Sequence, residues 1–450
     1  MRGISVDAGL AKLAAEAYVY GFPIVFDLEQ VNRYVTTGIG ANPAAPFNTF
    51  SHARALTTAD DTFVSINNDT VYSMASIDLS VGPVLLSVPD TAGRYYVLQF
   101  VDAWTNNFAY VGKRATGTGA RDFLLLPPDW EGEADDAGDA IAIRFPTRIA
   151  SIVGRWACDG TDDLPAVHAL QDATTLTPLR RSLVPPVGLP EAEAGPTEAL
   201  DFFEKLRVYS QTFPPGERDA ALQASFAPLG LLGAEPVGSL DDEVKVALEA
   251  GFMQGRALLD QILHSGAAPV VNGWTLTYHV FDYNLDFFEV GTIDDPAWKI
   301  ADPKVRIAQR AAGALGGLWG NHAYEAAYVM TYVDAAGEPL DGSHSYTLRL
   351  SPTPPVGAFW SLTMYSVPNF YLVANEIERY SIGDRTAGVV RDADGGITIT
   401  MSAARPADPA AAANWLPAPT GAFRPLLRMY MPDESVIDGS YVLPAIERSA

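Results

Sequence analysis

Two long stretches of this chain carry the pattern of β-strands, and a stretch with helical periodicity separates them. From Asn67 to about Arg155, and again from Asn321 to Ile446, short runs of β-branched and aromatic residues alternate with turns rich in proline and glycine. Such runs are typical of antiparallel sheets. Between them, apolar residues recur at helical spacing in residues 164–170, 202–211, 240–264 and 302–318. This order predicts two β domains joined by a helical segment.

The N-terminal residues predict a helical start. Asp7 can cap a helix from about Ala8 to Tyr34, and Gly21-Phe22-Pro23 predicts a kink or a second short helix within it. We therefore expect an α+β fold that is mainly antiparallel β. The expected division is N-terminal helices in residues 1–45, a first β domain in 46–157, a helical connecting segment in 158–320 and a second β domain in 321–450.

An internal repeat supports this division. Residues 87–100 (SVPDTAGRYYVLQF) align without a gap on residues 351–364 (SPTPPVGAFWSLTM), and a serine, a glycine, an aromatic pair and a leucine coincide. The alignment favours two related β modules. It also places Asp102 opposite Ser366, so the carboxylate is not a structural requirement of the module.

The composition excludes several classes of partner. The 450 residues include 54 acidic and 30 basic side chains, a net charge of −24. A strongly negative surface repels phosphate backbones and anionic lipid, so we expect no nucleic-acid and no membrane partner. The single cysteine, Cys158, excludes an internal disulfide framework. No apolar run has the length of a membrane span, and no signal peptide is evident, so we expect a cytoplasmic protein unless a leader has been removed.

Five ordered motifs show a family resemblance. They are NNDTVYSMASIDL (67–79), RYYVLQFVDAWTNNF (94–108), PPVGAFWSLTMY (354–365), RYSIGDR (379–385) and NWLPAP (414–419). Together they resemble the DUF1254/DUF1214 family, the first two fitting the DUF1254 part and the last three the DUF1214 part. The resemblance implies two jelly-roll-like β domains with helical additions, similar in layout to the double jelly rolls of large DNA virus capsids. It implies no established activity.

The first motif holds the first group of candidate site residues. Asn68, Asp69 and Tyr72 offer an amide, a carboxylate and a phenol within a few positions. Asp69 would act as a general acid or base if it is partly buried, with Tyr72 as a second catalytic group. The structural alternative is an Asx-type turn, in which Asp69 bonds backbone ahead of the following strand.

The second motif extends this group. Arg94, Tyr96, Leu98, Phe100 and Asp102 share one face of a strand, so Asp102 continues a large apolar face. It either caps the following turn or serves a pocket. If Asp102 and Asp69 converge, the pair would suit acid–base work or a hard cation such as Mg²⁺ or Ca²⁺. Trp104 and Asn107 would then line the pocket.

The RYSIGDR motif supplies two candidate ligand-binding arginines, Arg379 and Arg385, because a guanidinium suits a carboxylate or phosphate. The alternative is a structural salt bridge from one of them to Asp384. None of the six histidines has the spacing of a metal ligand set, and no nucleotide-binding motif is present, so we expect neither a transition metal nor a cofactor.

Two functions therefore remain open. The first is a non-redox enzyme or binder of a small polar molecule, with acid–base chemistry by carboxylates of the first β domain. The second is a structural or assembly protein without catalysis, in which tryptophans and tyrosines form the interfaces of a homo-oligomer. A large closed oligomer in size-exclusion chromatography would favour the second function, and a compact monomer or dimer with a carboxylate pocket would favour the first.

Overall fold

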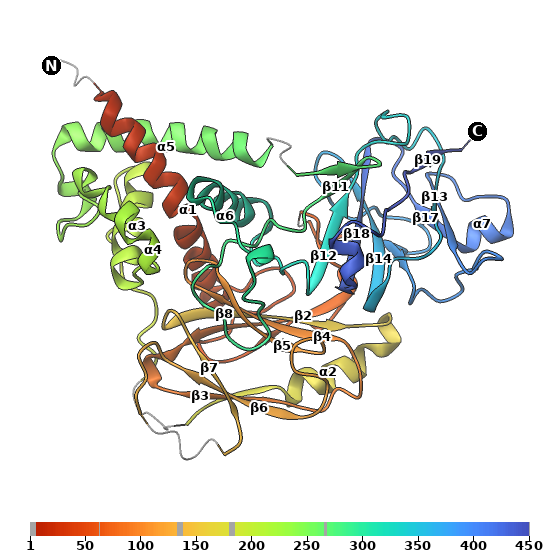
Figure 1. The fold of residues 1–450 in the computed structure, drawn as a ribbon, viewed down its shortest axis with the longest axis horizontal. Helices are drawn as coiled ribbons and strands as arrows, with labels where there is room; N and C mark the ends of the chain where they lie inside the picture. The colour runs from red at the N-terminus through yellow and green to blue at the C-terminus, as the bar shows by residue number, and fades with distance from the viewer. Residues whose placement is uncertain (1–5, 63, 133–137, 180–184, 265–267, 450) are drawn as a thin grey trace.

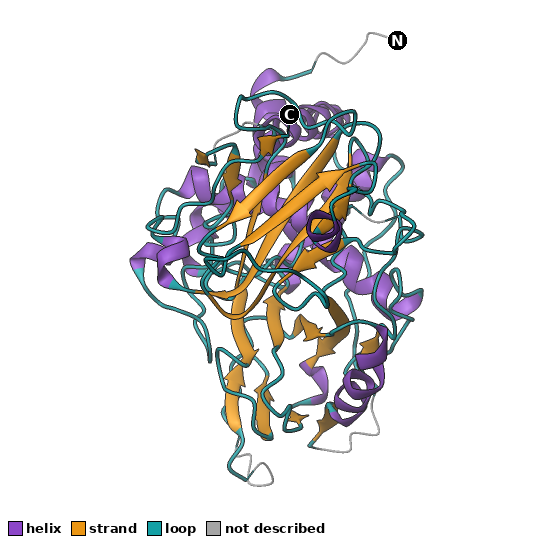
Figure 2. Cartoon of the chain, turned by 90° about the vertical axis from the view of Figure 1, so that its right-hand side faces the viewer, coloured by secondary structure: helices purple, strands orange, loops and turns teal. Residues whose placement is uncertain are grey.

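The fold is α+β and mainly antiparallel β, with two β modules and a layer of helices (Figure 1). The computed structural model describes residues 6–62, 64–132, 138–179, 185–264 and 268–449. The first module lies at the bottom of Figure 1, the second at the right and the helices at the upper left. Turned by 90°, the sheets of the two modules lie one above the other (Figure 2).

The first module is a sandwich of two sheets. One sheet has the order β1 (Ser51–His52), β2 (Thr70–Asp78), β8 (Ile149–Ala157), β4 (Tyr96–Asp102) and β5 (Asn107–Gly112). The other has the order β7 (Ile141–Arg144), β6 (Arg121–Leu126), β3 (Val84–Val88) and β9 (Thr175–Pro178). Because β9 pairs with β3 after helix α2 (Leu164–Ala173), this module extends to Pro178 and not to residue 157 as the sequence predicted.

The second module is also a sandwich of two sheets. Its larger sheet has the order β10 (Val270–Val271), β11 (Trp274–Leu276), β12 (Ala326–Met330), β18 (Phe423–Pro432), β14 (Val356–Ser366) and β15 (Ser381–Gly383). Its smaller sheet has the order β17 (Trp415–Pro417), β16 (Ile397–Ser402), β13 (Tyr346–Leu350) and β19 (Glu447–Arg448). The pairing of β11 with β12 brings residues near 270 into this module, ahead of the predicted boundary at 321. The jelly-roll character of the two sandwiches stays a prediction.

The helices pack around one buried N-terminal helix. This helix is α1 (Ala8–Thr36), and around it lie α3 (Glu198–Thr212), α4 (Glu217–Ala224), α5 (Asp242–Leu263) and α6 (Pro303–Gly317). The carboxylate of Asp7 accepts hydrogen bonds from the amides of Gly9 and Leu10, which confirms the predicted cap. The helix continues through Pro23, so the predicted alternative of a second short helix is not formed there.

Shorter helices complete the description. They are α7 (Pro409–Ala413), α8 (Glu434–Ile437) and the 3₁₀ turns η1 (Leu79–Val81), η3 (Thr161–Asp163), η4 (Ala227–Leu229), η5 (Val237–Ser239) and η6 (Pro296–Trp298). Within the described ranges, none of the helices is long and apolar enough to cross a membrane.

Candidate functional site

The two modules place equivalent tyrosine–arginine pairs on their larger sheets. In the first module, Arg155 of the central strand β8 lies opposite Tyr72 of β2 and Val97 of β4. In the second module, Arg428 of the central strand β18 lies opposite Tyr328 of β12 and Ser361 of β14. The predicted repeat aligns Val97 with Ser361, so the two registers are the same. The repeat therefore extends across three strands of each sheet.

The polar faces of these two sheets meet at an interface between the modules. Tyr95, directly before β4, contacts Tyr430 of β18 and Phe359 of β14 edge to face, with ring centroids 5.5 Å and 5.7 Å apart. Burial raises the pKa of Tyr328, while the charges of Arg155 and Arg428 oppose that rise. One tyrosine therefore lies within the electrostatic reach of an arginine from each module.

Arg155 is buried among uncharged acceptors. Its guanidinium donates to Oε1 of Gln99 at 2.8 Å, to the carbonyl of Trp319 at 2.8 Å and to Oδ1 of Asn321 at 3.4 Å. It also lies over the ring of Tyr72, 5.3 Å from the centroid. Asn321 in turn donates to the hydroxyl of Tyr328 at 3.1 Å, so a chain of hydrogen bonds joins the two tyrosine–arginine pairs.

Arg428 is held in the same manner on the opposite sheet. It donates to Oγ1 of Thr363 at 2.8 Å, to the hydroxyl of Tyr365 at 2.8 Å and to the carbonyl of Ser65 at 3.0 Å. Neither Arg428 nor Arg155 forms an ion pair with an acid in the part of the chain that the structure describes.

Asp69 brings a carboxylate to this interface from the first module. It lies directly before β2 and is buried. Its Oδ2 accepts a hydrogen bond from Ser361 at 2.5 Å, and its Oδ1 accepts one from Ser381 at 3.3 Å, both residues of the second module. The preceding turn is closed by Asn67, whose Oδ1 accepts from the amide of Asp69, so the carboxylate of Asp69 is not used in the predicted Asx turn.

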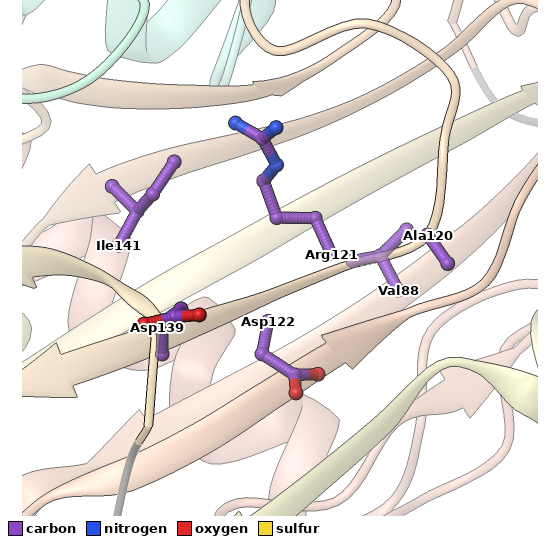
Figure 3. A pocket seen from close by; sticks show the side chains of 7 residues that line it. Val88, Ala120, Arg121, Asp122, Asp139 and Ile141 are labelled. Carbon is purple, nitrogen blue, oxygen red and sulfur yellow. The ribbon is translucent and has the colours of Figure 1, made fainter.

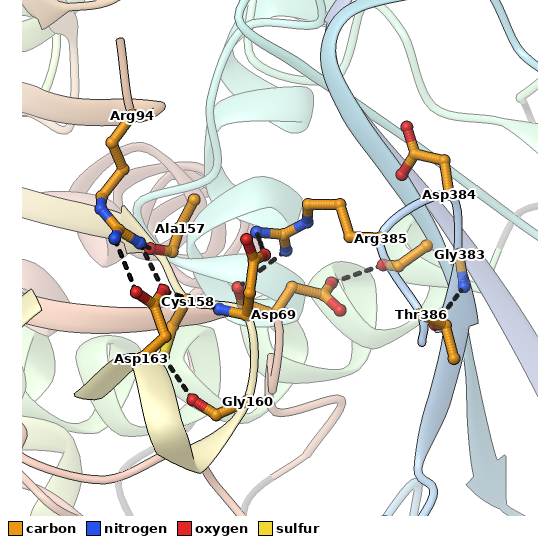
Figure 4. A network of polar contacts seen from close by, with 12 residues as sticks. Asp69, Arg94, Ala157, Cys158, Gly160, Asp163, Gly383, Asp384, Arg385 and Thr386 are labelled. Atoms are coloured by element: carbon orange, nitrogen blue, oxygen red, sulfur yellow. Dashed lines mark hydrogen bonds and ion pairs between the residues drawn. The ribbon is translucent and has the colours of Figure 1, made fainter. Parts of the chain in front are cut away.

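Arginines exchanged between the modules flank the site, and Figure 4 shows one of them, Arg385. Arg385 of the second module donates to the backbone carbonyl of Asp69 at 3.2 Å and pairs with Asp159 at 2.7 Å. Arg114 of the first module pairs with Glu325 of the second at 2.5 Å. These contacts are related by the repeat, because Gly112 lies opposite Val97 and Gly383 opposite Ser361.

The described structure separates Asp69 from Asp102. The amide of Cys158 bonds the carbonyl of Asp69, whereas Asp102 lies opposite Ala150. Ala150 and Cys158 lie eight residues apart, at the two ends of β8. At the rise per residue of an antiparallel strand, this separates Asp69 from Asp102 by about 26 Å. The carboxylate pair that the sequence allowed is therefore not formed.

Asp102 instead caps the turn after β4. Its Oδ1 accepts from the amides of Trp104 and Asn106, and its Oδ2 accepts from the side-chain amide of Asn106. It is fully buried, and burial raises its pKa. These contacts bear out the turn-capping alternative, and the pairing with Asp69 on which the catalytic role of Asp102 depended is not formed.

Some of the other residues predicted to form the site lie at the interface, and the rest lie elsewhere in the fold. Tyr72, Asn68 and Arg385 lie with Asp69, and Asn68 Oδ1 is buried without a hydrogen-bond partner. The side-chain oxygen of Asn107 accepts a hydrogen bond from Gln99 at 2.7 Å. Asn107 is therefore linked to the interface through Gln99, which is also a partner of Arg155.

Trp104 and Arg379 lie away from Asp69. Trp104 packs among the helices and donates to the carbonyl of Phe213. Arg379 donates to the carbonyls of Ala413 and Trp415 and therefore fixes the NWLPAP segment. The predicted salt bridge to Asp384 is not formed by either arginine, because Arg385 pairs with Asp159 instead.

Sequence reasoning missed Arg155, Ser361, Ser381, Tyr328 and Arg428. One of them, Tyr328, could have been found from a longer repeat. An acid, a tyrosine three residues later and a methionine two residues after that recur in Asp69-Thr-Val-Tyr72-Ser-Met74 and Glu325-Ala-Ala-Tyr328-Val-Met330. The arginines and serines become adjacent only through strand pairing.

A separate hollow lies on the first module's sheet of β7, β6, β3 and β9, with a volume of about 510 Å³ (Figure 3). It is lined by Val88, Ala120, Arg121, Asp122, Asp139, Ala140 and Ile141. Its charged residues are exposed, so it lacks the buried polar groups of the interface. Among the described residues, no group of three or more histidine, cysteine, aspartate and glutamate side chains could hold a metal ion.

Comparison with known proteins supports both modules. The chain is similar to the crystal structure of the VPA0106 protein from Vibrio parahaemolyticus, with a TM-score of 0.73 and 25% identity over 98% of this chain and 100% of that one. An uncharacterized protein from Burkholderia cenocepacia matches with a TM-score of 0.44 and 12% identity over 98% and 94% of the two chains. No curated protein matches.

Two family matches cover the parts that contain the paired sheets. Residues 47–178 match the family described as a protein of unknown function, DUF1254, and residues 325–434 match the one described as a protein of unknown function, DUF1214. The chain belongs to the family of proteins that carry DUF1254 and DUF1214 domains.

Proposed function

We propose that this protein binds a small polar molecule at the interface between its two β modules and acts on it by acid–base chemistry. The observation that carries the proposal is the environment of Asp69. Its buried carboxylate is held by Ser361 and Ser381 of the other module, and no described cation pairs with it. A buried carboxylate that no cation contacts directly is suited to proton transfer.

The neighbouring groups fit the same function. Asn68 supplies a buried acceptor, its Oδ1, that has no hydrogen-bond partner in the chain. Tyr72 and Tyr328 are half-buried and border the interface from opposite modules. In this proposal Asp69 takes or gives the proton, Tyr72 donates a hydrogen bond to the substrate, and Asn68 accepts one from it.

A depletion experiment tests this proposal. The purified protein is incubated with an extract of small polar metabolites, and the loss of each compound is followed by mass spectrometry. We expect the wild-type protein to deplete at least one compound. Asp69→Asn keeps the size of the side chain but removes the base, so it should slow this loss by about 100-fold or more.

Asp102→Asn is the matched control, because Asp102 is also a buried carboxylate but lies at the other end of the sheet. It should lower stability by about 1 kcal/mol through the lost hydrogen bond and leave the depletion rate near that of the wild type. Equal rates for Asp69→Asn and the wild type, or no depletion by the wild type, would contradict the proposal.

A further inference from the structure

The interface carries more buried positive charge than its described acids neutralise, because Arg155, Arg428 and Arg424 are all buried without an ion pair in the described part of the chain. Arg155 and Arg428 have exposed fractions of 6% and 3%. Asp69 is the carboxylate whose charge acts on Arg428. The other two acids at the border of the site, Glu325 and Asp159, are paired with Arg114 and Arg385.

Part of this excess charge belongs to Arg155. Its acceptors, Gln99, Asn321 and the Trp319 carbonyl, satisfy hydrogen bonds but supply no negative charge. A buried charge is costly unless it is paired, and the chain does not supply the pair in its described part. Arg114, by contrast, has an acid partner in Glu325.

We propose that the missing charge is supplied by the ligand, a small organic acid whose carboxylate binds between Arg155 and Arg428. The proposal rests on the function assigned above to the same interface and names its substrate class. A planar guanidinium matches a carboxylate. Arg155 lies over the ring of Tyr72, and Asn321, which accepts from Arg155, donates to the hydroxyl of Tyr328. The two half-buried tyrosines form the exposed border of this position.

The position of the carboxylate also orients the rest of the ligand. Asp69 lies on the same side of the interface as Ser361, which is opposite Arg428 in the sheet. A molecule anchored by its carboxylate would therefore present its neighbouring atoms to the carboxylate of Asp69 and to the free Oδ1 of Asn68. A donor group next to the carboxylate, such as a hydroxyl or amine, fits these two acceptors.

Bromide soaking tests the charge assignment. Crystals of the full-length protein are soaked in sodium bromide, and anomalous differences are measured above the bromine edge. We expect a bromide peak in contact with the Arg155 guanidinium. A second soak in sodium formate at equal ionic strength should replace that peak by planar density, and a bromide peak that formate does not displace would contradict the carboxylate assignment.

Two variants control the experiment. Arg155→Gln should lose the peak, whereas Arg256→Gln, which changes a half-exposed arginine on α5, should keep it. Crystals of the wild type that bind bromide elsewhere but show none at Arg155 would overturn the inference, even if Arg155→Gln fails to fold. Asp69-dependent depletion of a neutral compound without an anion at Arg155 would leave the proposed function intact and refute only the substrate class.

Discussion

Two acidic residues at equivalent positions have different partners. Glu325 is neutralised by Arg114 and accepts a hydrogen bond from Tyr95 at 3.0 Å. Asp69, its equivalent in the repeat, is held by two uncharged serines. The sequence indicated Asp69 and Tyr72 from local composition, but it could not show this difference because the partners are about 300 residues away.

Asp27 offers a test of burial at the residue scale. It is buried on α1 and accepts a hydrogen bond from Trp319 at 2.7 Å. Burial holds its pKa well above the usual value, and the nearby Asp102 adds to the rise. Because the folded-state pKa is raised, the associated stability is present below about pH 4 and is lost as the pH rises toward the folded-state pKa.

Asp27→Asn should therefore be more stable than the wild type at pH 7, and the difference should shrink toward pH 4. Asparagine keeps the acceptor for Trp319, and each unit of raised pKa costs the wild type about 1.4 kcal/mol at neutral pH. Urea unfolding at both pH values measures the difference. Glu16→Gln, on the exposed face of the same helix, should change stability by less than about 0.5 kcal/mol at either pH. A pH-independent effect of Asp27→Asn would contradict this prediction.

At the scale of elements, the long periodic segments were predictable and the short strands were not. The helix that begins after Asp7 follows from its cap and its apolar residues. Of the two alternatives predicted at Pro23, the second short helix was wrong, because packing of α1 against its neighbours outweighs the local preference, and the kink stays a prediction. Strands β9, β10 and β11 were missed since two to four residues carry too little periodicity to be recognised.

Close contact between α1 and α5 depends on a glycine. A Cβ added at Gly251 would lie 2.3 Å from the Cβ of Ala14 and 2.8 Å from the carbonyl of Ala11. Gly251→Ala should therefore destabilise the protein by about 1–3 kcal/mol, although alanine favours helices. Denaturant unfolding measures this change.

Gly313 of α6 is the control for this prediction. A Cβ there would meet Phe281 at 3.5 Å, an ordinary contact. Gly313→Ala should leave stability unchanged or raise it by up to about 1 kcal/mol through helix propensity. Equal effects of the two substitutions would show that close packing of α1 on α5 is not the cause.

At the scale of the whole molecule, the repeat determines where the site lies. Two sheets with the same strand register face each other, so their tyrosine–arginine pairs meet at the interface. The sequence predicted both β modules and a short part of the repeat, but the meeting of their polar faces is a tertiary property. The assembly function stays a prediction; exposed apolar side chains on α5, such as Met253 and Leu258, are its support in the described structure.

The most direct test of a functional interface is a high-resolution crystal structure of the protein purified without added ligand. We predict ordered density from a copurified molecule or ion beside Arg155 and Asp69, in contact with Tyr72 or Tyr328. Density from a bound molecule in the hollow at Arg121 and Asp122, with the side chains at the interface packed directly against one another, would contradict the account.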